Sequence, residues 1–167
     1  MPAEEEMLED DDESLNDWDY LHDQRDYFER LDSAMVHYKT DKVTEQCVQR
    51  AIADMIKSKG IICHREATPC DNSRVRMDLS GANYIVEVKM STKDLHKTIA
   101  QLNYYADKKP GEKRLFIAVH DSPRFDALDE DVWECDEYCI TLVNAAQCAR
   151  FVDETLRQDN LLDGYKK

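Results

Sequence analysis

The sequence predicts an α/β fold in which helices cover a mixed β-sheet. Five short runs rich in β-branched and aromatic residues have the length of strands, and segments with helical spacing of apolar residues lie between and around them. The predicted order is α-β-β-β-α-β, followed by β-α and preceded by a helical extension. With 167 residues, the chain has the length of one domain with an appendage.

The appendage is predicted at residues 1–38 and the folded domain at residues 39–167. Residues 1–16 are too acidic and too poor in large apolar groups to fold alone, which predicts a disordered tail. From Asp17 to about Tyr38, helical periodicity predicts an amphipathic helix that docks on another surface. The apolar positions of this helix are Trp18, Leu21, Phe28, Leu31 and Met35.

Caps and chain breakers mark the other helices. Thr40 or Asp41 is predicted to cap a helix that runs to about Lys59, where Gly60 ends it. Ser91 with Asp94 predicts a capping box, which opens a helix with four apolar residues on one face, Leu95, Ile99, Leu102 and Ala106. The sequence Lys108-Lys109-Pro110-Gly111 is predicted to stop that helix, and residues 145–157 predict a closing helix.

The strands are predicted from apolar runs with turn residues between them. The second and third are joined by Gly81-Ala82-Asn83, which is typical of a hairpin. Residues 68–73 are predicted as a loop, as is the acidic, proline-containing segment before the last strand. The predicted strands are Ile61–Glu66, Val75–Ser80, Tyr84–Met90, Leu115–Val119 and Tyr138–Val143.

The formal charge of −14 taken whole argues against a phosphate-rich partner, but the charge is uneven along the chain. Residues 1–38 hold 14 acidic and 2 basic residues, residues 39–120 hold 10 and 15, and residues 121–167 hold 12 and 5. A mildly basic middle of +5 therefore lies between an acidic head and an acidic tail, and this middle could bind phosphate.

The cysteines and the apolar runs bear on location. Six cysteines stand at irregular spacings without a C-x-x-C pair, which favours reduced thiols in a reducing, intracellular compartment, either cytoplasm or nucleus. A zinc or iron–sulfur site at Cys135, Cys139 and Cys148 is weakly indicated. The sequence contains no run of eighteen apolar residues and no secretory signal pattern, so we expect no membrane association.

The hairpin carries charged residues where a strand would usually be apolar. Glu87 and Lys89 share one face of their strand, and a tight turn would bring Asp78 on the neighbouring strand close to Glu87. Mg²⁺ is usually held by one or two carboxylates while it keeps several waters, and a lysine beside them could orient an attacking water or stabilise charge on a phosphate. The spacing fits an exposed cross-strand salt bridge on a solvated face equally well.

Asp78, a gap of eight residues and then Glu87-Val88-Lys89 resemble the motif of the PD-(D/E)xK nuclease superfamily, which has the restriction-endonuclease-like fold. The α-β-β-β-α-β order is similar to the core of that family, so the resemblance covers roughly residues 40–120. Met77 replaces the proline of the family's name. The resemblance implies a metal-dependent nuclease, in which Asp78, Glu87 and Lys89 are catalytic and Mg²⁺ or Mn²⁺ is the cofactor.

Two further features resemble branches of the same superfamily. Glu45, on the helix before the first strand, stands where archaeal Holliday-junction resolvases carry a metal-binding glutamate, so the resemblance implies metal ligands at Glu45, Asp78 and Glu87. Gln101 and Tyr105 match the Gln-x-x-x-Tyr motif of RecB-type nucleases, which implies a role in binding substrate or bracing Lys89. Glu45 could instead be a surface residue, and Tyr105 could serve packing alone.

The resemblance implies DNA as the nucleic-acid partner and an endonuclease of DNA repair or recombination. Four basic side chains could add phosphate contacts or simply lie on an edge strand, namely His64, Arg65, Arg74 and Arg76. His120 is either a second base or, more simply, a hydrogen-bonded structural histidine.

The alternative function is a catalytically inactive nuclease fold that binds a protein partner through its acidic N-terminal extension. The acidic head could also cover the basic groove of the same chain, and the helix at 17–38 is a candidate homodimer interface.

Overall fold

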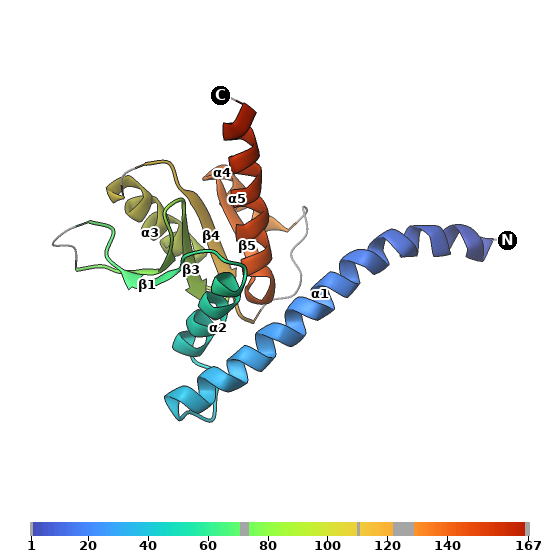
Figure 1. The fold of residues 1–167 in the computed structure, drawn as a ribbon, viewed down its shortest axis with the longest axis horizontal. Helices are drawn as coiled ribbons and strands as arrows, with labels where there is room; N and C mark the ends of the chain where they lie inside the picture. Colours follow the sequence, from blue (N-terminus) through green and yellow to red (C-terminus); the bar gives the residue numbers. More distant parts are fainter. Residues whose placement is uncertain (1, 71–73, 110, 122–128, 166–167) are drawn as a thin grey trace.

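The computed structural model describes residues 2–70, 74–109, 111–121 and 129–165, and within these ranges it describes side chains from residue 18 to residue 160. Five strands form one sheet in the order β1-β2-β3-β4-β5. β1, β2 and β3 pair antiparallel, whereas β3, β4 and β5 pair parallel, which confirms the predicted α/β class with a mixed sheet (Figure 1). The strands are β1 (His64–Ala67), β2 (Met77–Ser80), β3 (Tyr84–Lys89), β4 (Arg114–Val119) and β5 (Ile140–Asn144).

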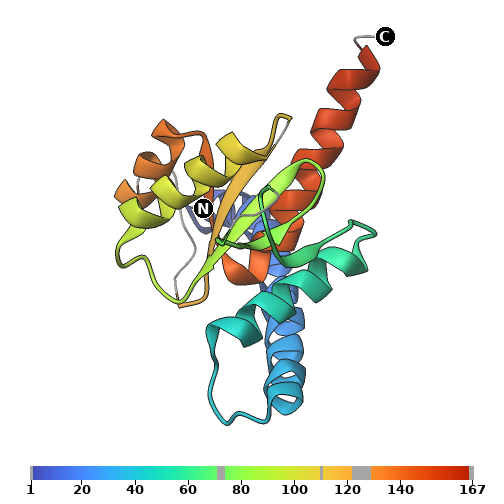
Figure 2. The ribbon, with the colours of Figure 1, turned by 90° about the vertical axis from the view of Figure 1, so that its left-hand side faces the viewer.

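Helices cover both faces of this sheet, as Figure 2 shows from the side. One face packs against α1 (Pro2–Tyr38), α2 (Glu45–Ser58), the short 3₁₀ helix η1 (Ala145–Gln147) and α5 (Cys148–Tyr165). The other face packs against α3 (Leu95–Lys108) and α4 (Glu130–Glu137), the crossovers between the parallel strands.

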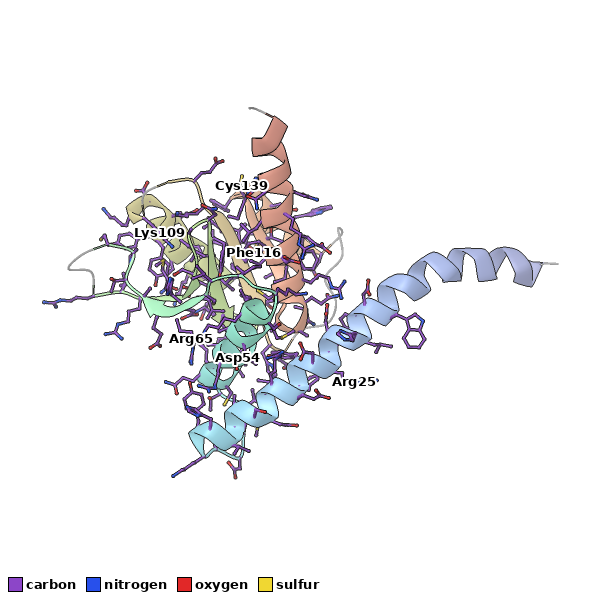
Figure 3. The ribbon with its side chains drawn as sticks, in the orientation of Figure 1. Arg25, Asp54, Arg65, Lys109, Phe116 and Cys139 are labelled. Carbon is purple, nitrogen blue, oxygen red and sulfur yellow. The ribbon has the colours of Figure 1, made fainter. Side chains whose placement is uncertain are left out.

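Side-chain alternation along the strands divides the core into two layers. Val86 and Phe116 belong to the layer under α1, α2 and α5, and Ile85 and Ile117 to the layer under α3 and α4. Phe116, labelled at the centre of Figure 3, is 1% exposed.

The cap of α2 differs from the prediction. Thr44 is the N-cap, and its side chain accepts a hydrogen bond from the Cys47 backbone N–H at 3.3 Å. Thr40 Oγ1 instead accepts from the Lys42 backbone N–H in a local turn, so a cap at Thr40 or Asp41 is wrong. The prediction that Gly60 follows the end of the helix is confirmed, and its φ of 82° suits a residue without Cβ.

The predicted capping box before α3 is also wrong. Asp94 occupies the N-cap position with a left-handed φ of 57° and makes no side-chain cap bond. Ser91 Oγ accepts from the Lys93 backbone N–H at 3.3 Å in a local turn, and the helix begins only at Leu95, so Ser91 does not cap it. The helix ends at Lys108 as expected, and Pro110 lies outside the described residues.

α1 begins at Pro2, so the predicted disordered tail at residues 1–16 is helical where the structure describes it. No glycine or further proline interrupts the segment, and proline is compatible with the first helical turn. The acidic half of α1 projects away from the sheet instead of lying over it (Figure 1). The hypothesis that this acidic head covers a groove of the same chain is therefore not supported by the fold.

The docking face of α1 matches the prediction only in part. Tyr27, Leu31 and Ala34 are each 1% exposed and share a core layer with α2 and the sheet. The predicted apolar positions Leu31 and Met35 contribute to this layer. Trp18, Leu21 and Phe28 are exposed. Trp18 lies opposite the buried face of the helix, and Leu21 and Phe28 lie on the flank of that face.

The segment between β4 and β5 was expected to be a loop, but residues 130–137 form α4. Asp129 caps this helix by accepting from the Asp131 backbone N–H at 2.9 Å, and Cys135 anchors it in the core. The rest of the expected loop at residues 122–128, like residues 71–73 of the other predicted loop, lies outside the described residues.

Candidate functional site

The β2–β3 hairpin places Asp78 opposite Glu87. Leu79 pairs with Val86, so the next residues of the two strands face each other. The Asp78 backbone N–H donates to Glu87 Oε1 at 3.3 Å, and the Val88 N–H donates to Asp78 Oδ2 at 2.8 Å. At this end of the hairpin the backbone N–H groups therefore donate to side-chain carboxylates instead of to the carbonyls of the neighbouring strand. The prediction that Asp78 and Glu87 lie together is confirmed.

Gly81 allows the hairpin turn to close tightly. Its backbone N–H donates to the Tyr84 carbonyl at 3.0 Å, and the Tyr84 hydroxyl donates to the Ile62 carbonyl at 2.7 Å. A Cβ at position 81 would overlap the Tyr84 ring and lie 2.9 Å from the Ile62 oxygen. Lys109, labelled in Figure 3, donates to the Gly81 carbonyl at 2.5 Å and ties the turn to the end of α3.

The acidic pair is buried, which rules out the exposed salt bridge as an interpretation of this hairpin. Glu87 is only 2% exposed and Asp78 is half-buried. Burial, followed by repulsion from Asp78, raises the pKa of Glu87 to about 9. Burial also raises the pKa of Asp78, although the Val88 N–H and the Lys89 charge oppose the shift. Two carboxylates in this position therefore carry a free-energy cost at neutral pH.

Lys89 and Glu45 lie within electrostatic reach of this pair. Glu45 is the first residue of α2, and its pKa is raised by partial desolvation and then by the charge of Asp78. The Lys89 ammonium, half-buried at the end of β3, lowers the pKa of all three carboxylates. Within the described ranges, however, no three His, Cys, Asp or Glu side chains are grouped closely enough to hold a metal ion together.

Gln101 and Tyr105, the predicted pair on α3, lie near Asp78 and Glu87. Gln101 Nε2 donates to the Tyr105 hydroxyl at 2.7 Å, and that hydroxyl donates to the Arg76 carbonyl at 3.1 Å, just before β2. Tyr105 is 1% exposed, and burial and the charge of Glu87 raise its pKa to about 12. Tyr105 therefore both packs in the core and adjoins the acidic pair, with Gln101 exposed beside it.

Sequence reasoning missed Glu66. Arg65 pairs with Leu79 and Ala67 with Met77, so Glu66 stands opposite Asp78 on β1, and its charge contributes to the raised pKa of Asp78. Its φ of 54° is unusual for a residue in a strand. Glu66 could have been found if the pairing register of β1 and β2 were known, because that register places Glu66 in one row with Asp78 and Glu87. The sequence alone does not determine that register.

The other singled-out residues divide between surface and structural positions. His64, Arg74 and Arg76 are exposed, whereas Arg65 is half-buried and donates to the Tyr38 hydroxyl at 3.0 Å. His120 Nδ1 lies 2.7 Å from the Tyr27 hydroxyl, and burial lowers its pKa. These contacts favour the structural role for His120 over that of a second base.

All six cysteines are free. Cys135 and Cys148 are buried while Cys139 is exposed in the turn before β5. Because no described group of three such ligands exists, a zinc or iron–sulfur site at these cysteines has no support in the part of the chain that the structure covers.

Comparisons with protein-family models, with curated proteins and with solved structures found no match. Among the described residues, no helix combines the length and the apolar character required to cross a bilayer. Any assignment of function to this chain therefore depends on the chemistry of the site.

That chemistry suits a hard divalent cation. Asp78 and Glu87 offer oxygen donors, which Mg²⁺ and Mn²⁺ prefer, and Mg²⁺ is commonly held by one or two carboxylates while it keeps several waters. A cation would also offset the desolvation that is the main cause of both raised pKa values. The donor set therefore fits such an ion at Asp78 and Glu87, with Glu45 adding negative charge nearby.

Proposed function

We propose that this chain is a metal-dependent nuclease that hydrolyses phosphodiester bonds in DNA. The observation that carries the proposal is the convergence of the hydrogen-bonded pair Asp78 and Glu87 with Lys89 and with the Gln101–Tyr105 pair. Under this proposal the five-stranded sheet with its two helical layers is a restriction-endonuclease-like core.

The residues of the site have distinct roles in this proposal. Asp78 and Glu87 would hold Mg²⁺ or Mn²⁺, which when bound polarises the phosphodiester and lowers the pKa of water. Lys89 orients the attacking water and stabilises the charge that develops on the phosphate oxygens. The water oxygen bonds to phosphorus and releases a proton to solvent, the bond to the leaving oxygen breaks, and that oxygen takes up a proton in return.

Gln101 and Tyr105 position the reacting groups and take no part in the bond changes. The Tyr105 hydroxyl links α3 to the chain just before β2, so it fixes the helix against the strand that carries Asp78. Gln101 holds this hydroxyl and is itself exposed, so its remaining polar atoms can contact the substrate backbone. Arg74 and Arg76, exposed on the approach to β2, add positive charge for phosphate.

The proposal is tested with isosteric variants. Asp78→Asn and Glu87→Gln keep the shape of the hairpin but replace a carboxyl group that can ionise on a metal with a neutral amide, so each should abolish Mg²⁺- or Mn²⁺-dependent cleavage. Asp107→Asn, an exposed carboxylate on α3, is the matched control and should cut like the wild type. The substrates are single-stranded, duplex, flap and four-way-junction DNA, with RNA as a further arm.

Cleavage that persists unchanged in both hairpin variants would place the active site elsewhere. Circular dichroism of each variant distinguishes loss of chemistry from loss of fold. Cleavage of RNA alone would keep the mechanism and change the substrate.

The second candidate is an inactive nuclease-like fold that serves as an adaptor. It is favoured by the finding that Glu45 does not join Asp78 and Glu87 in a three-ligand group among the described residues. Calorimetric titration with Mn²⁺ separates the two candidates, because a scaffold has no need of a metal site. Absence of binding at millimolar Mn²⁺ would favour the adaptor.

A further inference from the structure

The side of α1 that faces away from the core carries large apolar side chains. Trp18 is 69% exposed, Leu21 is 55%, Phe28 is 51% and Val36 is 78%. The core side of the same helix is complete without them, since Tyr27, Leu31 and Ala34 are buried there. We refer to Trp18, Leu21, Phe28 and Val36 as the outer stripe of α1.

The spacing of the outer stripe is that of a helix-docking seam. Positions 18, 21, 25 and 28 alternate three and four residues apart, with the charged Arg25 at the third of them, and Val36 lies two turns beyond Phe28. At 1.5 Å per residue the stripe is about 27 Å long, which matches a partner helix of about five turns. Arg25 stands within the stripe and points away from the body of the protein (Figure 3).

Ion pairs hold α1 in one orientation. Arg150 Nε donates to Asp23 Oδ2 at 2.6 Å, and a second nitrogen of Arg150 donates to Asp23 Oδ1 at 3.1 Å. Arg150 also pairs with Asp19 at 3.2 Å, one turn earlier. Because Asp23 and Tyr27 are fixed on the inner side, the helix cannot roll to bury the outer stripe in its own core.

The charged side chains beside the outer stripe indicate the kind of partner that would bind it. Glu29 and Asp32 are exposed beside Phe28, and in the described part of the chain neither takes part in an ion pair. The first 38 residues carry 14 acidic residues against 2 arginines. A second copy of the chain would bring the same negative charge, whereas a helix flanked by lysine and arginine would complement it.

We propose that the outer stripe of α1 docks an amphipathic, basic helix of a partner protein. The apolar seam of that helix packs on Trp18, Leu21 and Phe28, and its lysines or arginines face Glu29 and Asp32. The proposal does not depend on the nuclease function, because the stripe and the acidic pair lie on different elements.

The test uses Trp18 as a reporter. The chain has two tryptophans, so Trp133→Phe leaves Trp18 as the only one. The probe is a synthetic helix of about 20 residues with leucine at heptad spacing and lysine elsewhere, compared with a leucine–glutamate helix of the same pattern. The lysine helix should bind saturably and one to one, with a blue shift of Trp18 emission, and the glutamate helix should not bind.

Variants separate docking from general attraction of opposite charges. Leu21→Ser with Phe28→Ser keeps every charge and should weaken binding about tenfold or more. Phe151→Ser removes an exposed aromatic residue outside the stripe, on α5, and should leave binding unchanged. DNA cleavage should be unchanged in all these variants, so failure here is distinguishable from failure of the nuclease proposal.

Three results would overturn the inference. The lysine helix could bind equally to the Leu21→Ser, Phe28→Ser variant, which would reduce the contact to charge alone. The glutamate helix could bind as tightly as the lysine helix. Sedimentation could show a dimer of the chain whose formation buries Trp18, in which case the stripe serves a second copy.

Discussion

Glu87→Gln should stabilise the metal-free protein above neutral pH. In the folded chain, burial and the charge of Asp78 raise the Glu87 pKa from its ordinary 4.5 to about 9, so this carboxyl keeps its proton as the pH rises. The unfolded chain releases that proton above the ordinary pKa. The folded state is therefore relatively most stable below about pH 4.5, and it loses stability as the pH rises towards about pH 9.

The size of the effect follows from the shift. One proton that is held only by the folded state costs about 1.4 kcal/mol of stability per pH unit. Between about pH 5 and about pH 8 the loss of stability can therefore reach about 4 kcal/mol. We expect about 2 kcal/mol, because part of the shift is repulsion between Glu87 and Asp78 and the two groups titrate together. Glutamine imitates the protonated acid, since its amide can donate to Asp78 while its oxygen accepts the Asp78 backbone N–H.

Urea denaturation with a chelator present measures this effect. The free energy of unfolding of the wild type should fall between about pH 5 and about pH 8, and that of Glu87→Gln should fall less. Asp107→Asn is the matched control, because Asp107 is an exposed carboxylate on α3 and its loss should keep the wild-type slope. Parallel pH profiles for the wild type and Glu87→Gln would refute the reasoning.

Three further substitutions test how the site and α1 are held. Gly81→Ala should destabilise the fold by about 1–3 kcal/mol in thermal melts, because the new methyl group meets the Ile62 carbonyl; a wild-type melting temperature would contradict this. Arg150→Ala should cost about 2–3 kcal/mol in urea by removing both arginine hydrogen bonds from buried Asp23, whereas equal stability would mean that the pair does not hold α1. Tyr105→Phe should cost about 1 kcal/mol by removing two hydrogen bonds, and an unchanged midpoint in urea would show that they contribute nothing.

The hairpin could be predicted from the sequence because its causes are local. A period of two along β3 and a short turn at Gly81 determine which residues face each other, and both are visible in the residue order. The burial of Glu87 could not be predicted in this way. It depends on α3 lying over that face of the sheet, and nothing within the hairpin specifies where α3 packs.

Helix caps and the orientation of α1 show the same limit. Thr40, Asp41 and Thr44 all offer a capping oxygen, and only the packing of the first turn of α2 selects Thr44. α1 has apolar residues on two sides, so helical periodicity alone predicts a docking face made of the larger side chains, including Trp18 and Phe28. Arg150 decides the orientation, and it lies 127 residues from Asp23.

The acidic pair is a poor choice for a hairpin that serves only as scaffold. Threonine or valine at both positions would keep the strand and avoid burying like charges, so the pair costs stability that, under the proposed function, a bound cation would recover. A divalent cation at Asp78 and Glu87 would favour the ionised form of both, so binding near neutral pH must release the proton that Glu87 holds. Calorimetric titration with Mn²⁺ in buffers of different ionisation enthalpy counts that proton. Binding without proton release would contradict the assignment of Glu87 as a ligand.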